Sequence, residues 1–133
     1  GDVEVDFHHT IEDTGIVLGE MLEEAVDKEK IRRFGFGSIP MDEALSEVSL
    51  DFSGRNYLVI NFPEKKVSGI DLRVFEHFFK SLSDNAGLTL HIQTSGEGPH
   101  HIIESTFKAF AVSLKEAVII SKNEGPRSTK GHL

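Results

Sequence analysis

The chain has 133 residues, no Cys and a formal net charge of −8 at pH 7. This charge argues against broad nucleic-acid binding, and the lack of Cys excludes disulfides and thiolate metal ligands. No apolar run approaches the roughly 18 residues that a membrane-spanning helix needs. Length and composition therefore predict one cytoplasmic domain, or two small repeats that share a core.

The first third of the chain is predicted to hold a strand, a helix and a connector. Apolar and polar residues alternate over 3–7, which is typical of a strand. Apolar residues at helical spacing predict a helix over 8–26, in which Gly15 and Gly19 would let another backbone come close. Residues 27–38 are charged and rich in Gly, and we expect a connector there.

The rest of the chain predicts two strands followed by a helix, a strand and a second helix. The two strands are expected over 47–52 and 57–62, joined as a hairpin by a tight turn. An amphipathic helix is expected over 71–83. The remaining segments are a strand over 88–93, a Gly-rich loop over 94–99, a helix over 100–120 and a tail over 124–133.

One motif occurs twice. The pentad His-His-Thr-Ile-Glu at 8–12 returns as His-His-Ile-Ile-Glu at 100–104, and the stretches 8–26 and 100–118 agree at nine of nineteen positions. The second copy reads strand, strand, helix, strand, helix, whereas the first shows only the last strand and helix of that series. We therefore predict a duplicated α+β fold whose first repeat is incomplete and begins before Gly1. Its parts would be the end of the first repeat with a connector over 1–43, the second repeat over 44–122 and a tail over 123–133.

Each pentad has the composition of a metal site. Because residues i and i+4 share one face of a helix, the first His and the Glu of a pentad can reach one ion. The second His lies about 100° around the helix, so a pair points in two directions and can serve two ions. Imidazole with carboxylate suits Mn, Fe, Zn, Co or Ni. The ligands predicted from the pentads are His8, His9, Glu12, His100, His101 and Glu104.

Four further side chains have less certain roles. His77 stands among bulky apolar residues, and it is either a core histidine or a further metal ligand. His91 on a strand and His132 in the tail are interpreted as non-ligands. Lys108 lies one turn beyond Glu104, and it either pairs with that carboxylate or contacts a bound ligand.

Charged loops offer candidate anion sites. Arg32-Arg33, Arg55 and the segment 128–131 (Ser-Thr-Lys-Gly) could each hold an anion, although a solvated loop charge explains each of them singly. Asp42-Glu43, with Glu47, could form an acid pair, and negative charge at a helix N-terminus explains them equally well.

Taken together, these segments resemble the imidazoleglycerol-phosphate dehydratase family of histidine biosynthesis. The resemblance runs in family order over essentially the whole chain, and the two His-His motifs with the Ser-Thr-Lys-Gly tail make it specific. The matching segments are 6–13, 31–35, 42–45, 51–55, 77–79, 90–92, 100–104, 107–109 and 128–131.

The resemblance implies a fold, a cofactor and an assembly. The fold would be a duplicated β-β-α-β-α repeat of the ribosomal protein S5 domain 2-like class, with helices packed on one face of the sheet. Two Mn²⁺ ions would lie in each active site, and the sites would lie between subunits of a homo-oligomer of 24 chains. The reaction would be loss of water from imidazole glycerol phosphate to give imidazole acetol phosphate.

The resemblance also assigns roles to residues. It adds His77 to the metal ligands, and it makes phosphate contacts of Arg33, Arg55, Ser128 and Lys130. A carboxylate near the metals could move the proton. The candidates for catalysis are Glu12, Glu104 and Lys108, although each Glu is better placed as a ligand.

Two alternatives stay open at this point. The family's N-terminal half-repeat, with an Arg-x-Thr-x-Glu-Thr motif and a His-Met-Leu motif, has no counterpart in this chain. The chain could therefore be a non-catalytic, metal-stapled oligomeric fragment that is inactive without its N-terminal segment. An unrelated dinuclear metallohydrolase would use the same kinds of ligand.

Overall fold

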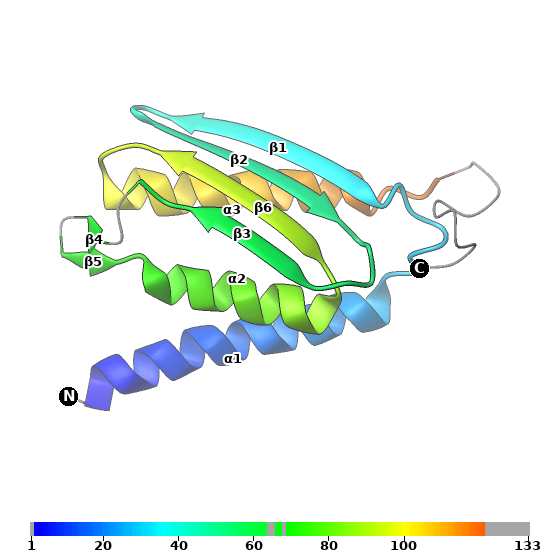
Figure 1. Ribbon diagram of the computed structural model, residues 1–133, viewed down its shortest axis with the longest axis horizontal. Helices are drawn as coiled ribbons and strands as arrows, with labels where there is room; N and C mark the ends of the chain where they lie inside the picture. Colours follow the sequence, from blue (N-terminus) through cyan, green and yellow to red (C-terminus); the bar gives the residue numbers. More distant parts are fainter. Residues whose placement is uncertain (1, 64–65, 68, 122–133) are drawn as a thin grey trace.

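The computed structural model describes residues 2–63, 66–67 and 69–121. Within these ranges a long helix comes first, followed by strands and two further helices (Figure 1). The elements are α1 (Asp2–Ala25), β1 (Phe34–Met41), β2 (Ala44–Asp51), β3 (Tyr57–Asn61), β4 (Lys66–Val67), β5 (Ile70–Asp71), α2 (Arg73–Ala86), β6 (Thr89–Ser95) and α3 (Pro99–Ala117).

A four-stranded sheet with the order β1-β2-β6-β3 forms the centre of the fold. The pairs β1–β2 and β2–β6 are antiparallel, whereas β3–β6 is parallel. Helices α2 and α3 cover one face of this sheet, and α1 lies against α2 (Figure 1). The predicted α+β fold with helices on one face of the sheet is confirmed.

The core fills the space between the sheet and the two covering helices. Alternate residues of β2 and β6 point inward, in agreement with the period of two along a strand. Burial of their apolar side chains against α2 and α3 is the main source of stability. The core includes Val48, Leu50, Phe52, Phe79, Leu82, Leu90, Ile92 and Phe110.

Strand β1 lies where a connector was predicted for 27–38, and that prediction is wrong. Its buried positions are glycines, while Phe34 and Phe36 face solvent. A Cβ at Gly35 would overlap the carbonyl oxygen of Ser113 on α3, so the strand and the helix backbone lie in direct contact. The strand was missed because small residues, rather than apolar ones, alternate on its inner side.

The N-terminal segment is also different from its prediction. Residues 3–7 belong to α1 and form no strand. A helix satisfies its own backbone hydrogen bonds within the segment. The close approach predicted at Gly15 and Gly19 is confirmed, since a Cβ at Gly15 would stand 2.6 Å from the carbonyl oxygen of Phe78 on α2.

The predicted hairpin between the two middle strands is wrong, because β6 lies between β2 and β3. Helix α2 carries the chain from β3 to β6, as a parallel pair requires a crossover. The true hairpin joins β1 to β2 through Asp42 and Glu43. Asp42 has a φ of 49°, which the tight two-residue turn requires. The helix N-terminus suggested for these two acids is therefore wrong.

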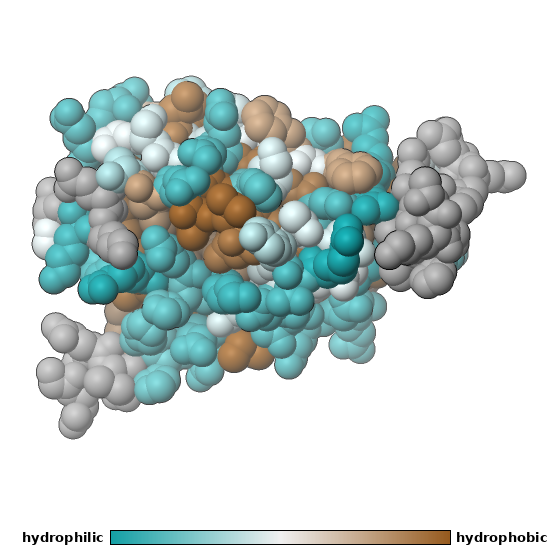
Figure 2. Space-filling model, viewed as in Figure 1, coloured by the Kyte–Doolittle hydropathy of each residue, from teal (hydrophilic) through white to brown (hydrophobic). Residues whose placement is uncertain are grey.

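The later elements agree with the sequence. Helix α2 ends at Gly87, whose φ of 66° closes the helix in the left-handed region. Strand β6 and helix α3 lie at the predicted places. No helix in the described part of the chain is long and apolar enough to cross a membrane. Figure 2 shows a mostly hydrophilic face with an apolar area near its centre, where Figure 1 places β3 and β6.

Helices α1 and α3 correspond to each other in more than sequence. An open groove of about 490 Å³ runs along α1. When the two pentads are aligned, the residues of α1 that line this groove correspond to the residues of α3 that face the sheet. Val17 and Met21 in this groove are more than half exposed. The groove is lined by Thr10, Asp13, Thr14, Val17, Leu18 and Met21, which align with Ile102, Ser105, Thr106, Ala109, Phe110 and Ser113. The same face is thus covered by a sheet on α3 and open on α1.

Candidate active site

All three helices begin at the same end of the molecule (Figure 1). Both pentads and His77 lie in the N-terminal halves of these helices, so the predicted metal ligands gather at this end. We call the group the histidine end. It consists of His8, His9, Glu12, His77, His100, His101 and Glu104.

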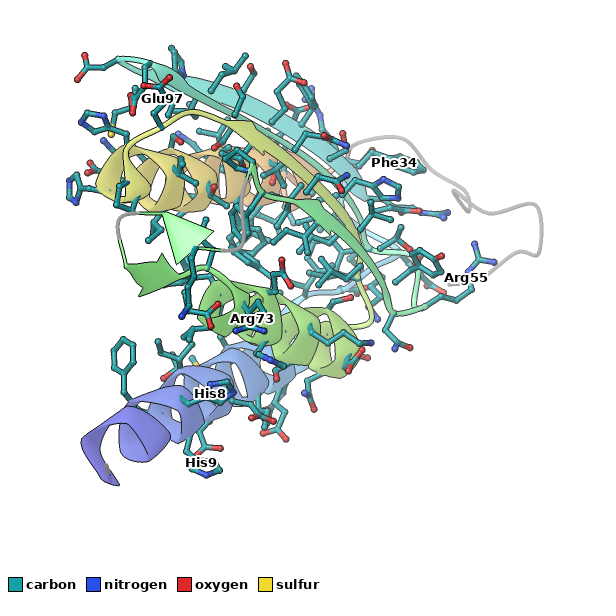
Figure 3. All side chains as sticks on the ribbon, turned by 60° about the vertical axis from the view of Figure 1, so that its left-hand side comes forward. His8, His9, Phe34, Arg55, Arg73 and Glu97 are labelled. Atoms are coloured by element: carbon teal, nitrogen blue, oxygen red, sulfur yellow. The ribbon has the colours of Figure 1, made fainter. Side chains whose placement is uncertain are left out.

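Helices α1 and α2 bring two histidines together. The ring of His8 lies 4.9 Å from the ring of His77, measured between centroids. His77 is exposed, so the interpretation as a core histidine is wrong. Figure 3 shows His8 on the side of α1 that faces α2, and His9 on the side that faces away. Glu12 is half-buried one turn beyond His8.

Helix α3 holds a row of three charged or polar groups. His100 Nε2 lies 2.8 Å from one oxygen of Glu104, and Lys108 Nζ lies 2.8 Å from the other. Lys108, followed by His100, lowers the pKa of Glu104. The carboxylate is thus ionised and suited to binding a cation. Lys108 pairs with Glu104, which was the first of its two predicted roles.

The neighbouring His101 points in another direction, as predicted for an adjacent pair. Its Nδ1 lies 2.9 Å from Oε2 of Glu43 in the β1–β2 turn, and its Nε2 lies 3.5 Å from Asp42 Oδ2. The backbone N–H of Gly98 donates to the same Glu43 carboxylate at 2.8 Å. Glu43 raises the pKa of His101, while His101 and the N–H of Gly98 lower the pKa of Glu43.

The predicted phosphate contacts lie at the other end of the sheet. Arg33 is buried with a φ of 80°, and its Nε and Nη2 donate to the two carboxylate oxygens of Asp51 at 2.6 and 3.2 Å. Arg55 is exposed in a turn that Ser53 closes by accepting the Arg55 N–H at 3.1 Å. Ser128 and Lys130 lie outside the described residues.

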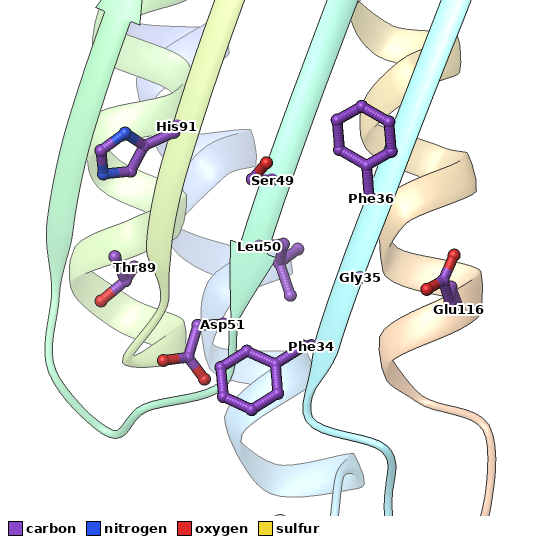
Figure 4. Close-up of a pocket in the computed structure, with 9 residues that line it drawn as sticks. All are labelled: Phe34, Gly35, Phe36, Ser49, Leu50, Asp51, Thr89, His91 and Glu116. Atoms are coloured by element: carbon purple, nitrogen blue, oxygen red, sulfur yellow. The ribbon is translucent and has the colours of Figure 1, made fainter.

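A surface pocket of about 310 Å³ lies on the solvent side of the sheet near Arg33 (Figure 4). Phe34 and Phe36 of β1 form one wall, and Asp51, the partner of Arg33, stands at one end. His91 also lines this pocket.

The two ends are too far apart to serve one small substrate within a single chain. The backbone N–H of Arg33 bonds the carbonyl of Ala117 at the end of α3, whereas His100 stands at its start. At 1.5 Å per residue these points are about 25 Å apart. Figure 3 likewise shows Arg55 at the opposite end from His8. Among the described residues, no three His, Asp or Glu side chains converge so that they could hold one ion.

Two partners of predicted residues were not identified from the sequence. The sequence indicates Glu43 only as part of an acidic pair, and Asp51 has no predicted role of its own within the matching segment 51–55. Strand pairing explains both, because the turn at Glu43 and the end of β2 at Asp51 place these carboxylates beside His101 and Arg33. No local motif indicates such contacts, since they depend on the register of β1.

The sheet with helices on one face makes this an α+β protein, and the corresponding helices α1 and α3 with their pentads make the fold a duplicated one. A family model described as imidazoleglycerol-phosphate dehydratase matches residues 1–114. A relative of that name from Methanosphaerula palustris is 54% identical over the whole chain, which spans 70% of the relative, and one from Alkaliphilus metalliredigens is 51% identical with 71% spanned. The chain therefore belongs to the imidazoleglycerol-phosphate dehydratase family, whose name makes its members hydro-lyases.

Solved structures agree with this assignment. The crystal structure of the IGPD from Pyrococcus furiosus, in complex with (S)-C348, superposes with a TM-score of 0.86 at 39% identity, covering 96% of this chain and 72% of that one. The imidazoleglycerol-phosphate dehydratase from Staphylococcus aureus superposes with a TM-score of 0.78 at 43% identity, covering 86% and 69%. The family assignment makes the metallohydrolase alternative wrong.

Proposed function

We propose that the chain forms the active sites of a metal-dependent imidazoleglycerol-phosphate dehydratase, which removes water from imidazole glycerol phosphate to give imidazole acetol phosphate. The observation that carries the proposal is the family match over 1–114, which includes both pentads in full. Within the protein the two pentads lie on helices that begin at the same end, with α2 between them (Figure 1).

The residues at the histidine end suit divalent metal ions. His100 Nε2 and Glu104 Oε2 stand 2.8 Å apart on the surface, so one imidazole nitrogen and one carboxylate oxygen are already adjacent. Such nitrogen and oxygen donors suit Mn²⁺ and its first-row neighbours. We propose that His8, His9, Glu12, His77, His100, His101 and Glu104 hold two Mn²⁺ ions per site. When bound, the ions would supply Lewis acidity toward the imidazole ring of the substrate.

The chain's own groups then have distinct tasks. The proton to be removed lies on a carbon beside the imidazole ring, and the hydroxyl leaves from the neighbouring carbon. Glu12 and Glu104 are the proposed carboxylates to accept that proton, and Lys108 pairs with Glu104 at 2.8 Å and lowers its pKa. Arg33, Arg55, Ser128 and Lys130 would bind the phosphate and so orient the substrate.

Distance supports sites that are shared between subunits. Arg33 and His100 lie near opposite ends of α3, about 25 Å apart, and the described part of one chain offers no complete metal site. A homo-oligomer could place the arginines of one subunit beside the histidines of another. We propose such an assembly, of 24 chains as the family resemblance implies, in the cytoplasm.

The open groove along α1 supports the proposed division into two repeats. Residues 1–43 would hold the end of a first repeat and the segment that leads into the second, in which β1 stands in place of the predicted connector. Residues 44–122 would form the second repeat and residues 123–133 the tail. A sheet equivalent to the one on α3 would cover Val17 and Met21 in the first repeat.

Substitutions at the two ends test the proposal against a non-catalytic, metal-stapled fragment. Arg55→Ala should abolish substrate binding while oligomer size and Mn²⁺ content stay unchanged, because Arg55 is exposed in a turn at the opposite end of the molecule from His8 (Figure 3). Isothermal titration with substrate, light scattering and metal analysis measure these three properties. If the unsubstituted chain binds Mn²⁺ and assembles but shows no dehydration, the fragment interpretation replaces the enzyme.

A further inference from the structure

We infer that Glu43 is a positioning residue that holds the ring of His101 so that Nε2 faces a bound divalent ion. The inference rests on the proposed function, because it needs a metal ion at the histidine end. The family match places no role on Glu43, and the contact arises from a turn far from His101 in sequence.

The Glu43 carboxylate joins two elements. Its Oε1 accepts the backbone N–H of Gly98 at 2.8 Å, and its Oε2 lies 2.9 Å from Nδ1 of His101. The pairing of Met41 with Ala44 fixes the turn that carries Glu43. The side chains of Glu43 and His101 are each 35% exposed, so both are packed on one side and open on the other.

This contact selects one form of the imidazole ring. A carboxylate only accepts hydrogen bonds, so Nδ1 of His101 must carry the proton. A neutral imidazole has one N–H, which leaves the lone pair on Nε2. A carboxylate on the outer nitrogen of a metal-binding histidine fixes its tautomer and orientation and strengthens it as a ligand.

The other nitrogen of the ring lies on the exposed side. Asp42 Oδ2 is 3.5 Å from Nε2, which is too long for a hydrogen bond, and its side chain is 82% exposed. Nε2 of His101 therefore has no hydrogen bond among the described contacts. Nδ1, by contrast, has a short one with Glu43. His100 and Glu104 occupy the adjacent direction of the same helix.

The substitution Glu43→Gln tests the inference in the full chain. We expect the new amide oxygen to keep the N–H of Gly98, although Oε1 also lies 3.1 Å from Nδ1 of His101, so that the NH₂ group takes the place of Oε2, which is the nearer of the two at 2.9 Å. That group only donates, and it favours the tautomer with the proton on Nε2. We expect Mn²⁺ affinity, measured by the electron paramagnetic resonance of free Mn²⁺, to fall 10- to 100-fold. Glu43→Asp keeps the carboxylate and should restore part of the affinity.

Glu47→Gln is the matched control, because it removes the same charge from an exposed position four residues further along the chain. It should leave Mn²⁺ affinity within about twofold of the unsubstituted chain. A second readout is the ¹⁵N spectrum of histidine-labelled protein, in which His101 of the unsubstituted chain should carry its proton on Nδ1. This measurement decides the inference even if Glu43→Gln does not fold.

The outcomes separate the inference from the proposed function. If the unsubstituted chain does not bind Mn²⁺, both fail. If it binds Mn²⁺ and Glu43→Gln binds equally well, or if His101 carries its proton on Nε2 beside an intact Glu43, the positioning role alone is wrong. Reduced affinity together with a changed tautomer supports the inference, because a purely structural role for Glu43 would not move the proton.

Discussion

The imidazole rings of His8 and His77 lie 4.9 Å apart, one on α1 and the other on α2. The two helices run side by side because Gly15 and Gly19 let their backbones approach. The two histidines are far apart in the sequence, so their contact depends on the packing of the two helices. It places His77 beside the first pentad, and its role as a metal ligand stays a prediction.

Replacing His77 with Ala should weaken Mn²⁺ binding by at least tenfold without unfolding the chain. The residue is exposed, so the change removes a proposed ligand and leaves no cavity. Isothermal titration with Mn²⁺ measures the affinity. His91→Ala is the control, since His91 lies on the outer face of the sheet. Equal affinity of the two variants would remove His77 from the ligand set.

Strand β1 makes a stability prediction. Gly35→Ala would drive a methyl group into the backbone of Ser113, and we expect a loss of about 1–3 kcal/mol in the free energy of unfolding. Urea denaturation followed by circular dichroism measures it. Ser38→Ala on the exposed side of the same strand should change stability by less than about 0.5 kcal/mol. A Gly35→Ala chain as stable as its parent would contradict the close contact of β1 with α3.

The close contact of β1 with α3 also shows why some elements could be predicted from the sequence and others could not. Helices α2 and α3 were predictable because large apolar residues recur along them at helical spacing. Strand β1 was not, because Gly35 and Gly37 occupy its buried positions. The buried face of α3 likewise includes the small residues Ser105, Ala109 and Ser113. Small residues that permit close backbone contact leave no hydrophobic pattern.

The start of α2 should lose stability in acid. The side chain and then the backbone N–H of Arg73 hold the pKa of Asp71 well below its ordinary value of 3.8. Because the pKa of Asp71 is lower in the folded state, ionised Asp71 stabilises that state at any pH above its ordinary pKa. This stabilisation is lost as the pH falls through the lower pKa of the folded state. A ¹³C titration should show a higher Asp71 pKa in Arg73→Gln. An unchanged pKa would contradict the pairing.

Shared sites predict complementation between inactive variants. Arg55→Ala and His100→Ala should each lack activity, because one loses a phosphate contact and the other a metal ligand. When the two are unfolded together and reassembled, mixed oligomers would contain some sites with both residues intact. Dehydratase assays should then show partial recovery. If the site were complete within one chain, the mixture would stay inactive.

The sequence predicts which residues gather at the histidine end but not how they are arranged. The repeated His-His-x-x-Glu spacing identifies the helix faces, and His100 does lie beside Glu104. The neighbours supplied by strand register, Glu43 for His101 and Asp51 for Arg33, have no sequence signature. Their positions follow only once β1 is paired with β2.

The most direct test of the central claim is the rate of imidazole glycerol phosphate dehydration with and without Mn²⁺, for the chain and for its His8→Ala, His100→Ala double variant. We predict that chelation abolishes turnover, that Mn²⁺ restores it, and that the double variant stays inactive at any Mn²⁺ concentration. Turnover that survives chelation, or full activity of the double variant, would contradict a metal-dependent reaction at the histidine end.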